Sequence, residues 1–299
     1  MFRCINLRLI VYLQQIIKTF NTKKAMKIFK VFRFVLVLTI SCVILTVYSC
    51  GQSQQAKPAE EQTINKDDVK ESVSEIIQHI PSPFELAQKL DDIGAGYMPT
   101  ALNDVEKIDK YFTEKNKALN LGVYGADLAY VTTYDKKQDV NVYAAAVKTL
   151  IDELNIAINF TEIVSEDTKE KMENKDTIVK VVTNTFYEVY DFLNENSDPS
   201  LAALVATGIW VESLYLAMQI SEETFNNNDF VQIIYNQQTS LGKLIELLDN
   251  FKDDELIQQQ KTALTKLKQQ FESTDGSLTL AQLKSIGQTI STIRSSIVE

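Results

Sequence analysis

Residues 198–218 read Asp198-Pro-Ser-Leu-Ala-Ala-Leu-Val-Ala-Thr-Gly-Ile-Trp-Val-Glu-Ser-Leu-Tyr-Leu-Ala-Met218. Asp198 is a residue type that caps the start of a helix, and Pro199 suits the first helical position, where its missing N–H costs no hydrogen bond. From Ala202 to Met218 the side chains are apolar on nearly every side of a helix, whereas a surface helix has one apolar stripe. The stretch therefore predicts a central helix that is buried all round.

The rest of the chain repeats apolar residues at intervals of three and four, which is the helical period. Pro81-Ser82-Pro83 is expected to end one helix and start the next, with Ser82 as its cap. Thr113 and Asn116 are expected to open a long helix that runs to Tyr134. Further apolar stripes run along residues 69–80, 143–158, 178–193, 241–251, 256–271 and 283–297.

Two weaker helices are expected between these stripes. Asn103 or Thr100 is expected to cap a short helix through Ile108 and Phe112, and a polar helix is expected over residues 162–173. No stretch shows sustained strand alternation bounded by hairpin turns, and only nine Gly and five Pro interrupt 299 residues. The predicted fold class is all-α: a multi-helix bundle, or stacked helical hairpins, of about eight helices.

A weak internal repeat links the central helix to the helix over residues 113–134. Gly122-Val-Tyr-x-x-x-Leu128 aligns with Gly208-Ile-Trp-x-x-x-Leu214, 86 residues apart. The helices that follow align as 150–154 with 244–248, at a separation of 94 residues. Chance similarity among apolar helices is one explanation. The other is a duplication whose glycine-containing helices pack at the centre, because Gly122 and Gly125 lie on a small-residue face that permits close approach.

Polar residues inside these two apolar helices are the candidate site. Tyr124, Asp127, Tyr130 and Tyr134 fall near one helical face, and Glu212 and Tyr215 fall near one face of the other helix, which also carries Trp210. An unpaired buried carboxylate is costly, so Asp127 and Glu212 must face water, meet a partner or line a pocket. The alternatives are a structural hydrogen-bond network and a groove for a small ligand or peptide.

The N-terminal region has the order of features found in export signals. Lys27, Lys30 and Arg33 form a basic segment, and an uncharged apolar run follows from Phe34 to Tyr48. That run has roughly 15 residues, short of the roughly 20 needed for a permanent transmembrane helix. It ends on Val47-Tyr-Ser-Cys50.

This ending resembles the lipobox of bacterial lipoproteins, although Tyr48 is bulkier than the residue usual at its position. The resemblance implies cleavage before Cys50, diacylglycerol on its sulfur, and acylation of the new N-terminus. The alternative is an uncleaved N-terminal anchor helix. Gly51 resembles the residue that follows the cysteine in lipoproteins sorted to the outer membrane, which favours that membrane over the inner one.

These features divide the chain into four parts. Met26-Lys27 suits the start of a signal, so residues 1–25 are interpreted as a misannotated upstream extension; a genuine amphipathic extension is the alternative. Residues 26–49 are the predicted signal peptide, 50–66 a polar flexible tether, and 67–299 a single all-helical domain.

The net charge argues against two classes of partner. Eight of the 30 basic residues and none of the 40 acidic ones precede Cys50, so the chain from Cys50 carries 22 basic and 40 acidic residues, a net charge of −18. Such a domain is not expected to bind nucleic acid or to adhere to an anionic membrane surface. The expected partners are the membrane, through the N-terminal lipid, and another protein or a cell-wall component.

Few side chains for catalysis are present. His79 is the only histidine, and no cysteine besides Cys50 follows the predicted signal, so zinc sites and Cys-His nucleophiles are not expected. No cofactor, metal or catalytic residue is predicted. The favoured function is a non-enzymatic binding or structural module of the cell envelope. The alternative is a carboxylate-dependent cell-wall hydrolase that uses Asp127 and Glu212, since such chemistry needs two carboxyl groups in a cleft.

Overall fold

The computed structural model describes residues 66–158, 174–196, 198–219, 224–272 and 276–299. The predicted signal peptide, Cys50, nearly all of the tether and the polar helix over residues 162–173 lie outside the described residues. Residues 64–299 form one compact unit.

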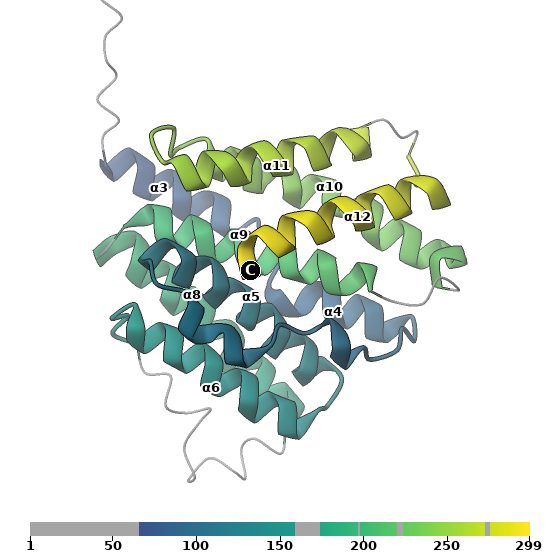
Figure 1. The fold of residues 1–299 in the computed structure, drawn as a ribbon, viewed down its shortest axis with the longest axis horizontal. Helices are drawn as coiled ribbons and strands as arrows, with labels where there is room; N and C mark the ends of the chain where they lie inside the picture. Colours follow the sequence, from purple (N-terminus) through teal and green to yellow (C-terminus); the bar gives the residue numbers. More distant parts are fainter. Residues whose placement is uncertain (1–65, 159–173, 197, 220–223, 273–275) are drawn as a thin grey trace, which may run out of the picture. The chain divides into compact units, whose positions relative to one another are not determined.

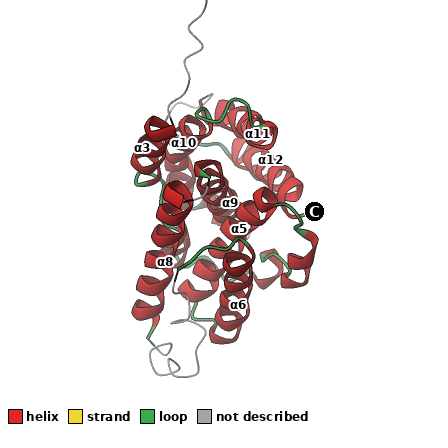
Figure 2. Ribbon diagram, turned by 90° about the vertical axis from the view of Figure 1, so that its left-hand side faces the viewer, coloured by secondary structure: helices red, strands yellow, loops and turns green. Residues whose placement is uncertain are grey.

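The described part of this unit is built from helices and loops, and contains no strand (Figure 2). An all-α multi-helix bundle is therefore confirmed. The helices, shown in Figure 1, are α3 (Lys66–Ile77), α4 (Pro83–Asp92), α5 (Glu114–Thr133), α6 (Lys137–Glu153), α8 (Lys175–Asn196), α9 (Pro199–Met218), α10 (Asn228–Leu248), α11 (Glu255–Glu272) and α12 (Leu280–Val298). Short 3-10 helices are η1 (Pro99–Ala101), η2 (Val105–Lys110) and η5 (Thr224–Asn226).

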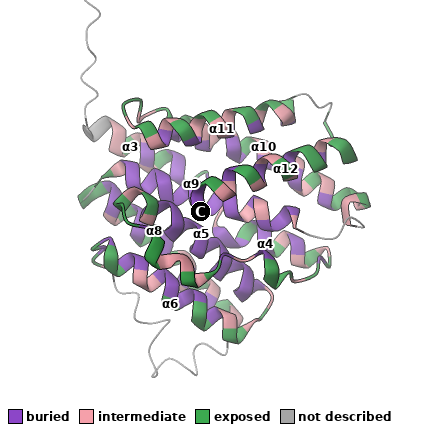
Figure 3. Cartoon of the chain, viewed as in Figure 1, coloured by how far each residue is buried: buried purple, intermediate pink, exposed green. Residues whose placement is uncertain are grey.

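Helix α9 is the centre of the bundle, as its apolar composition predicts. It packs against α3, α4, α5, α8, α10 and α12, and nearly all of its side chains are buried (Figure 3). Among the described residues it is the one helix long and apolar enough to cross a membrane. Its burial inside the bundle accounts for that composition, because a helix covered on every side needs no polar face.

Helix α5 is the closest neighbour of α9, and glycine makes the approach possible. A Cβ atom on Gly122 would lie 2.2 Å from the Val205 carbonyl oxygen, and one on Gly208 would lie 2.0 Å from the Leu119 carbonyl oxygen. The two backbones therefore touch at Gly122 and Gly208. This confirms the prediction that the glycine-containing helices pack together at the centre.

The contact is reciprocal. Gly122 meets the residue three positions before Gly208, and Gly208 meets the residue three positions before Gly122. The surrounding contacts match in the same way: α6 and α8 pack on α5, as α10 and α12 pack on α9. The match is partial, because α8 also packs on α9 and α12 also packs on α5.

Most predicted helix starts are found where the sequence places them. Ser82 precedes α4 with Pro83 at its first position, although the Ser82 hydroxyl makes no capping hydrogen bond. The Thr113 hydroxyl accepts the Asn116 N–H, and the Asp198 carboxylate accepts the Ser200 N–H.

The short helix predicted through Ile108 and Phe112, with Asn103 or Thr100 as its cap, is wrong in detail. The structure has instead the 3-10 helix η2, which Asp104 caps and which ends before Phe112. The Phe112 side chain is exposed.

Candidate functional site

The polar face of α5 binds the segment that connects α4 to α5, residues 93–113. Each of the four polar residues predicted on this face makes a hydrogen bond to that segment. The Tyr124 hydroxyl donates to the Asp104 carbonyl at 2.8 Å, and the Tyr134 hydroxyl donates to the Ala95 carbonyl at 2.9 Å. Tyr130 and Asp127 instead accept backbone N–H groups, those of Met98 at 3.0 Å and Asn103 at 3.2 Å respectively.

Helix α6 holds the same segment from the other side. The Tyr143 hydroxyl donates to the Asn103 carbonyl at 2.9 Å, and Tyr97 of the segment donates to the Asp139 carboxylate at 2.7 Å. Burial raises the pKa of Tyr124 and of Tyr143, so both phenols stay protonated and remain donors. The tyrosines therefore satisfy backbone groups of this irregular segment.

Glu212 of α9 forms a buried ion pair with Arg294 of α12. The Arg294 Nε donates to Glu212 Oε2 at 2.9 Å, and a terminal guanidinium nitrogen donates to Oε1 at 3.1 Å, which is a bidentate arrangement. The Glu212 side chain is fully buried, and that of Arg294 is 12% exposed. The guanidinium carbon also lies 4.6 Å from the centre of the Tyr215 ring, so Tyr215 covers the pair through a cation–π contact.

Asp127 completes the cluster beside Glu212. Its Oδ2 accepts the Asn103 N–H, whereas its Oδ1 has no donor among the described residues. The two carboxyl groups are within hydrogen-bonding reach of each other. Burial, followed by the charge of Glu212, raises the pKa of Asp127 well above its usual range, and Arg294 opposes this shift.

A proton on Asp127 accounts for this geometry. Arg294 supplies one positive charge, which balances one carboxylate and not two. A protonated Asp127 can donate to Glu212, which satisfies the oxygen that otherwise has no donor. The cluster is then neutral overall, with Glu212 ionised, Asp127 protonated and Arg294 charged.

Trp210 takes no part in this cluster. Its Nε1 donates to the Ser240 hydroxyl of α10 at 2.9 Å. The structure thus brings Asp127, Glu212 and Tyr215 together, places the tyrosines of α5 on the connecting segment, and places Trp210 on the α9–α10 contact.

No protein-family model matches this chain, and no curated protein or solved structure does.

The residue that sequence reasoning missed is Arg294. It lies four residues after Ile290 and three before Ile297, both members of the buried stripe of α12. A basic residue at that position must either extend to solvent or find an acidic partner in the core. The position of Arg294 in this buried stripe is the sequence feature that would have predicted an acidic partner such as Glu212 in the core.

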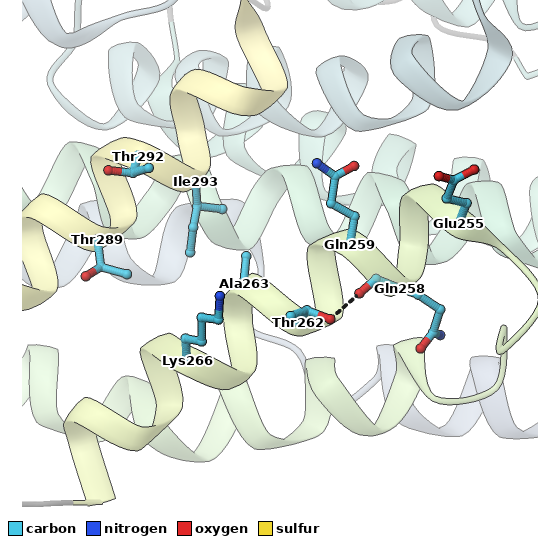
Figure 4. Close-up of a pocket in the computed structure, with 9 residues that line it drawn as sticks. All are labelled: Glu255, Gln258, Gln259, Thr262, Ala263, Lys266, Thr289, Thr292 and Ile293. Atoms are coloured by element: carbon cyan, nitrogen blue, oxygen red, sulfur yellow. Dashed lines mark hydrogen bonds between the residues drawn. The ribbon is translucent and has the colours of Figure 1, made fainter.

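A second candidate site is an open groove between α11 and α12 (Figure 4). Its volume is about 640 Å³, within the range of roughly 300–1,000 Å³ typical of ligand pockets. Ala263 and Ile293 face each other across it, and threonine hydroxyls and glutamine side chains surround them (Figure 4). Neither Asp127 nor Glu212 lines this groove.

Neither site offers a metal centre. In the part of the chain that the structure describes, no three His, Cys, Asp or Glu side chains are grouped so as to hold a metal ion. The buried cluster contributes two carboxyl groups, and Arg294 already occupies one of them.

The proton that Asp127 donates to Glu212 leads to a prediction for the Asp127→Asn variant. Because the folded pKa of Asp127 lies above its unfolded value, its stabilising contribution is complete below about pH 4 and is lost as the pH rises through the folded pKa. We expect this contribution to the free energy of unfolding to fall by up to about 1.4 kcal/mol per pH unit. The Asn amide can donate to Glu212 without a titrating proton. The variant should therefore lose this part of the dependence of the unfolding free energy on pH.

Urea unfolding of residues 66–299 between pH 5 and 8 measures this effect. The control is Asp152→Asn, which changes an exposed carboxylate on α6 and should keep the wild-type slope. A variant Asp127→Asn with an unchanged slope would show that Asp127 is not the protonated partner.

Proposed function

We propose that this chain is a lipid-anchored protein of the bacterial cell envelope whose helical domain binds another envelope protein. One observation carries the proposal: a basic segment, an uncharged apolar run and the lipobox-like Val47-Tyr-Ser-Cys50 stand in that order before the domain. The residues that follow Cys50 are polar and low in complexity, which suits a tether. The outer membrane is the proposed location.

The chemistry of the domain favours binding over catalysis. The two carboxyl groups that a hydrolase would use are both fully buried, and Glu212 is held by Arg294. A glycosidic bond would have to reach them through the packed bundle, whereas such enzymes hold their carboxyl groups in an open cleft. The geometry therefore gives the hydrolase alternative no support.

Acylation of Cys50 is tested by metabolic labelling with a palmitate analogue. We expect the wild-type protein to carry the label and to migrate at its processed size. Cys50→Ala should lose the label and accumulate as the longer precursor, because both cleavage and acylation require that sulfur in the lipoprotein route.

The matched control is Cys42→Ala, which removes a cysteine from the apolar run and should leave labelling and processing intact. Label retained on Cys50→Ala would contradict the proposal. An unlabelled, unprocessed wild-type protein would favour the anchor-helix alternative.

A further inference from the structure

The groove between α11 and α12 has opposite charges at its two ends. Glu255 lies at the start of α11, and Lys266 lies eleven residues later on the same helix (Figure 4). Along a helix that separation corresponds to about 16 Å. The charges therefore mark two ends of a linear site.

These two charges are also the ones that α11 leaves unpaired. Lys261 pairs with Asp249, and Lys268 pairs with Glu272 at 3.2 Å. Among the described residues, the side chains of Glu255 and Lys266 make neither an ion pair nor a hydrogen bond. The charged groups on α11 are thus partnered except where they border the groove.

The groove between these ends suits a peptide main chain. Its walls carry the amide of Gln259, which can donate to and accept from peptide groups. The Thr262 hydroxyl already donates to the Gln258 carbonyl and can accept. The Thr289 hydroxyl already accepts from the Gln270 amide and can donate. Ala263 and Ile293 supply an aliphatic floor. No aromatic ring lines the groove.

We propose that this groove binds an extended peptide segment of a protein partner, with a cationic side chain near Glu255 and an anionic one near Lys266. An extended chain rises about 3.3 Å per residue and places every second side chain on one face. Side chains six residues apart therefore share a face and span about 20 Å, and the long Lys and Glu side chains can adjust to the separation of about 16 Å along α11. The inference names the site and ligand class of the binding role proposed above, and rests on that role.

Heptapeptide pools test the proposal against the full chain purified in detergent. Each fluorescent pool has five mixed uncharged residues between its ends, which are Lys and Glu, two Lys, two Glu, or two Gln. In 20 mM salt we expect the Lys–Glu pools, made in both orders, to bind about fivefold more tightly than the Gln pool. Exposed ion pairs contribute roughly 0.2–1 kcal/mol each, and this preference should fade in 0.5 M salt.

Substitutions at the ends should switch the preference. Glu255→Lys should prefer the pool with two Glu, and Lys266→Glu should prefer the pool with two Lys. Thr262→Trp, which places a large uncharged side chain in the middle of the groove, should lower the affinity for every pool at least tenfold. Lys137→Glu on α6 makes the same charge change outside the groove and should bind as wild type.

Several results would overturn the inference. They are binding of no pool at 1 mM, an unchanged order of preference in the Glu255 and Lys266 variants, and binding of an N-acetylglucosamine tetramer in place of the peptides. The acyl label on Cys50 is a separate readout. A labelled protein that binds no pool contradicts the peptide groove alone, and an unlabelled protein that binds them contradicts the lipid anchor alone.

Discussion

Arg294→Met should lower the free energy of unfolding at pH 7 by about 3–5 kcal/mol, the loss expected when one partner of a buried ion pair is removed. Met fills similar space without a charge, so the loss reports the Glu212 carboxylate left without its two donors. The loss should shrink toward pH 4, because Glu212 can then take up a proton. Urea unfolding of residues 66–299 measures both effects.

Two further variants measure the contribution of the Glu212–Arg294 ion pair separately from other effects. Arg294→Met combined with Glu212→Gln should lose less stability than the sum of the two single variants, because the single changes each leave a buried charge alone. Lys148→Met removes an exposed ion pair with Asp152 on α6 and should change stability by less than about 1 kcal/mol. A loss below 1 kcal/mol for Arg294→Met would mean that the ion pair is not buried as described.

Gly122→Ala and Gly208→Ala should each cost about 3 kcal/mol, the upper end of the usual range for overpacking. The added methyl group would lie 2.2 Å or less from a carbonyl oxygen of the facing helix. Backbone atoms inside a helix cannot rotate away as a side chain can, so α5 and α9 would have to separate. Thermal and urea unfolding should show the loss.

Gly242→Ala is the matched control, since Gly242 also lies inside a helix. The nearest atom to its added Cβ is 3.9 Å away, at the end of the Lys268 side chain. This variant should gain about 0.5–1 kcal/mol from the better helix propensity of alanine. Wild-type stability in both Gly122→Ala and Gly208→Ala would contradict backbone contact between α5 and α9.

The parts of the fold that sequence could predict depend on local chemistry. The cap at Asp198, the proline after it and the all-round apolar pattern define α9 without reference to any other helix. The glycines of α5 and α9 predicted close packing for a similar reason, since a small-residue face has few other uses inside a buried helix.

The connecting segment could not be predicted in the same way. Within it, the 3-10 helix η2 begins after Asp104, where Tyr124 and Tyr143 of two other helices donate hydrogen bonds to the carbonyls of Asp104 and Asn103. Tertiary contacts of this kind override local helix propensity. The aromatic residues at intervals of three and four on α5 were visible, but the backbone groups that they bind were not.

The candidate site was predictable only in part. The sequence shows that Asp127 and Glu212 need partners, because each interrupts a run that would otherwise be buried. It does not show that they meet each other, or that Arg294, 82 residues after Glu212, completes the cluster. The groove was also missed, since it forms between two amphipathic helices whose sequences resemble ordinary solvated faces.

The most direct test of a lipid-anchored envelope protein is the intact mass of the chain isolated from the membrane fraction of its native cells. The predicted mass is that of residues 50–299 with acyl groups on Cys50, and fragmentation should place all of the added mass on that first residue. A chain that begins at Met26 or earlier and carries no acyl group would contradict the proposed anchor.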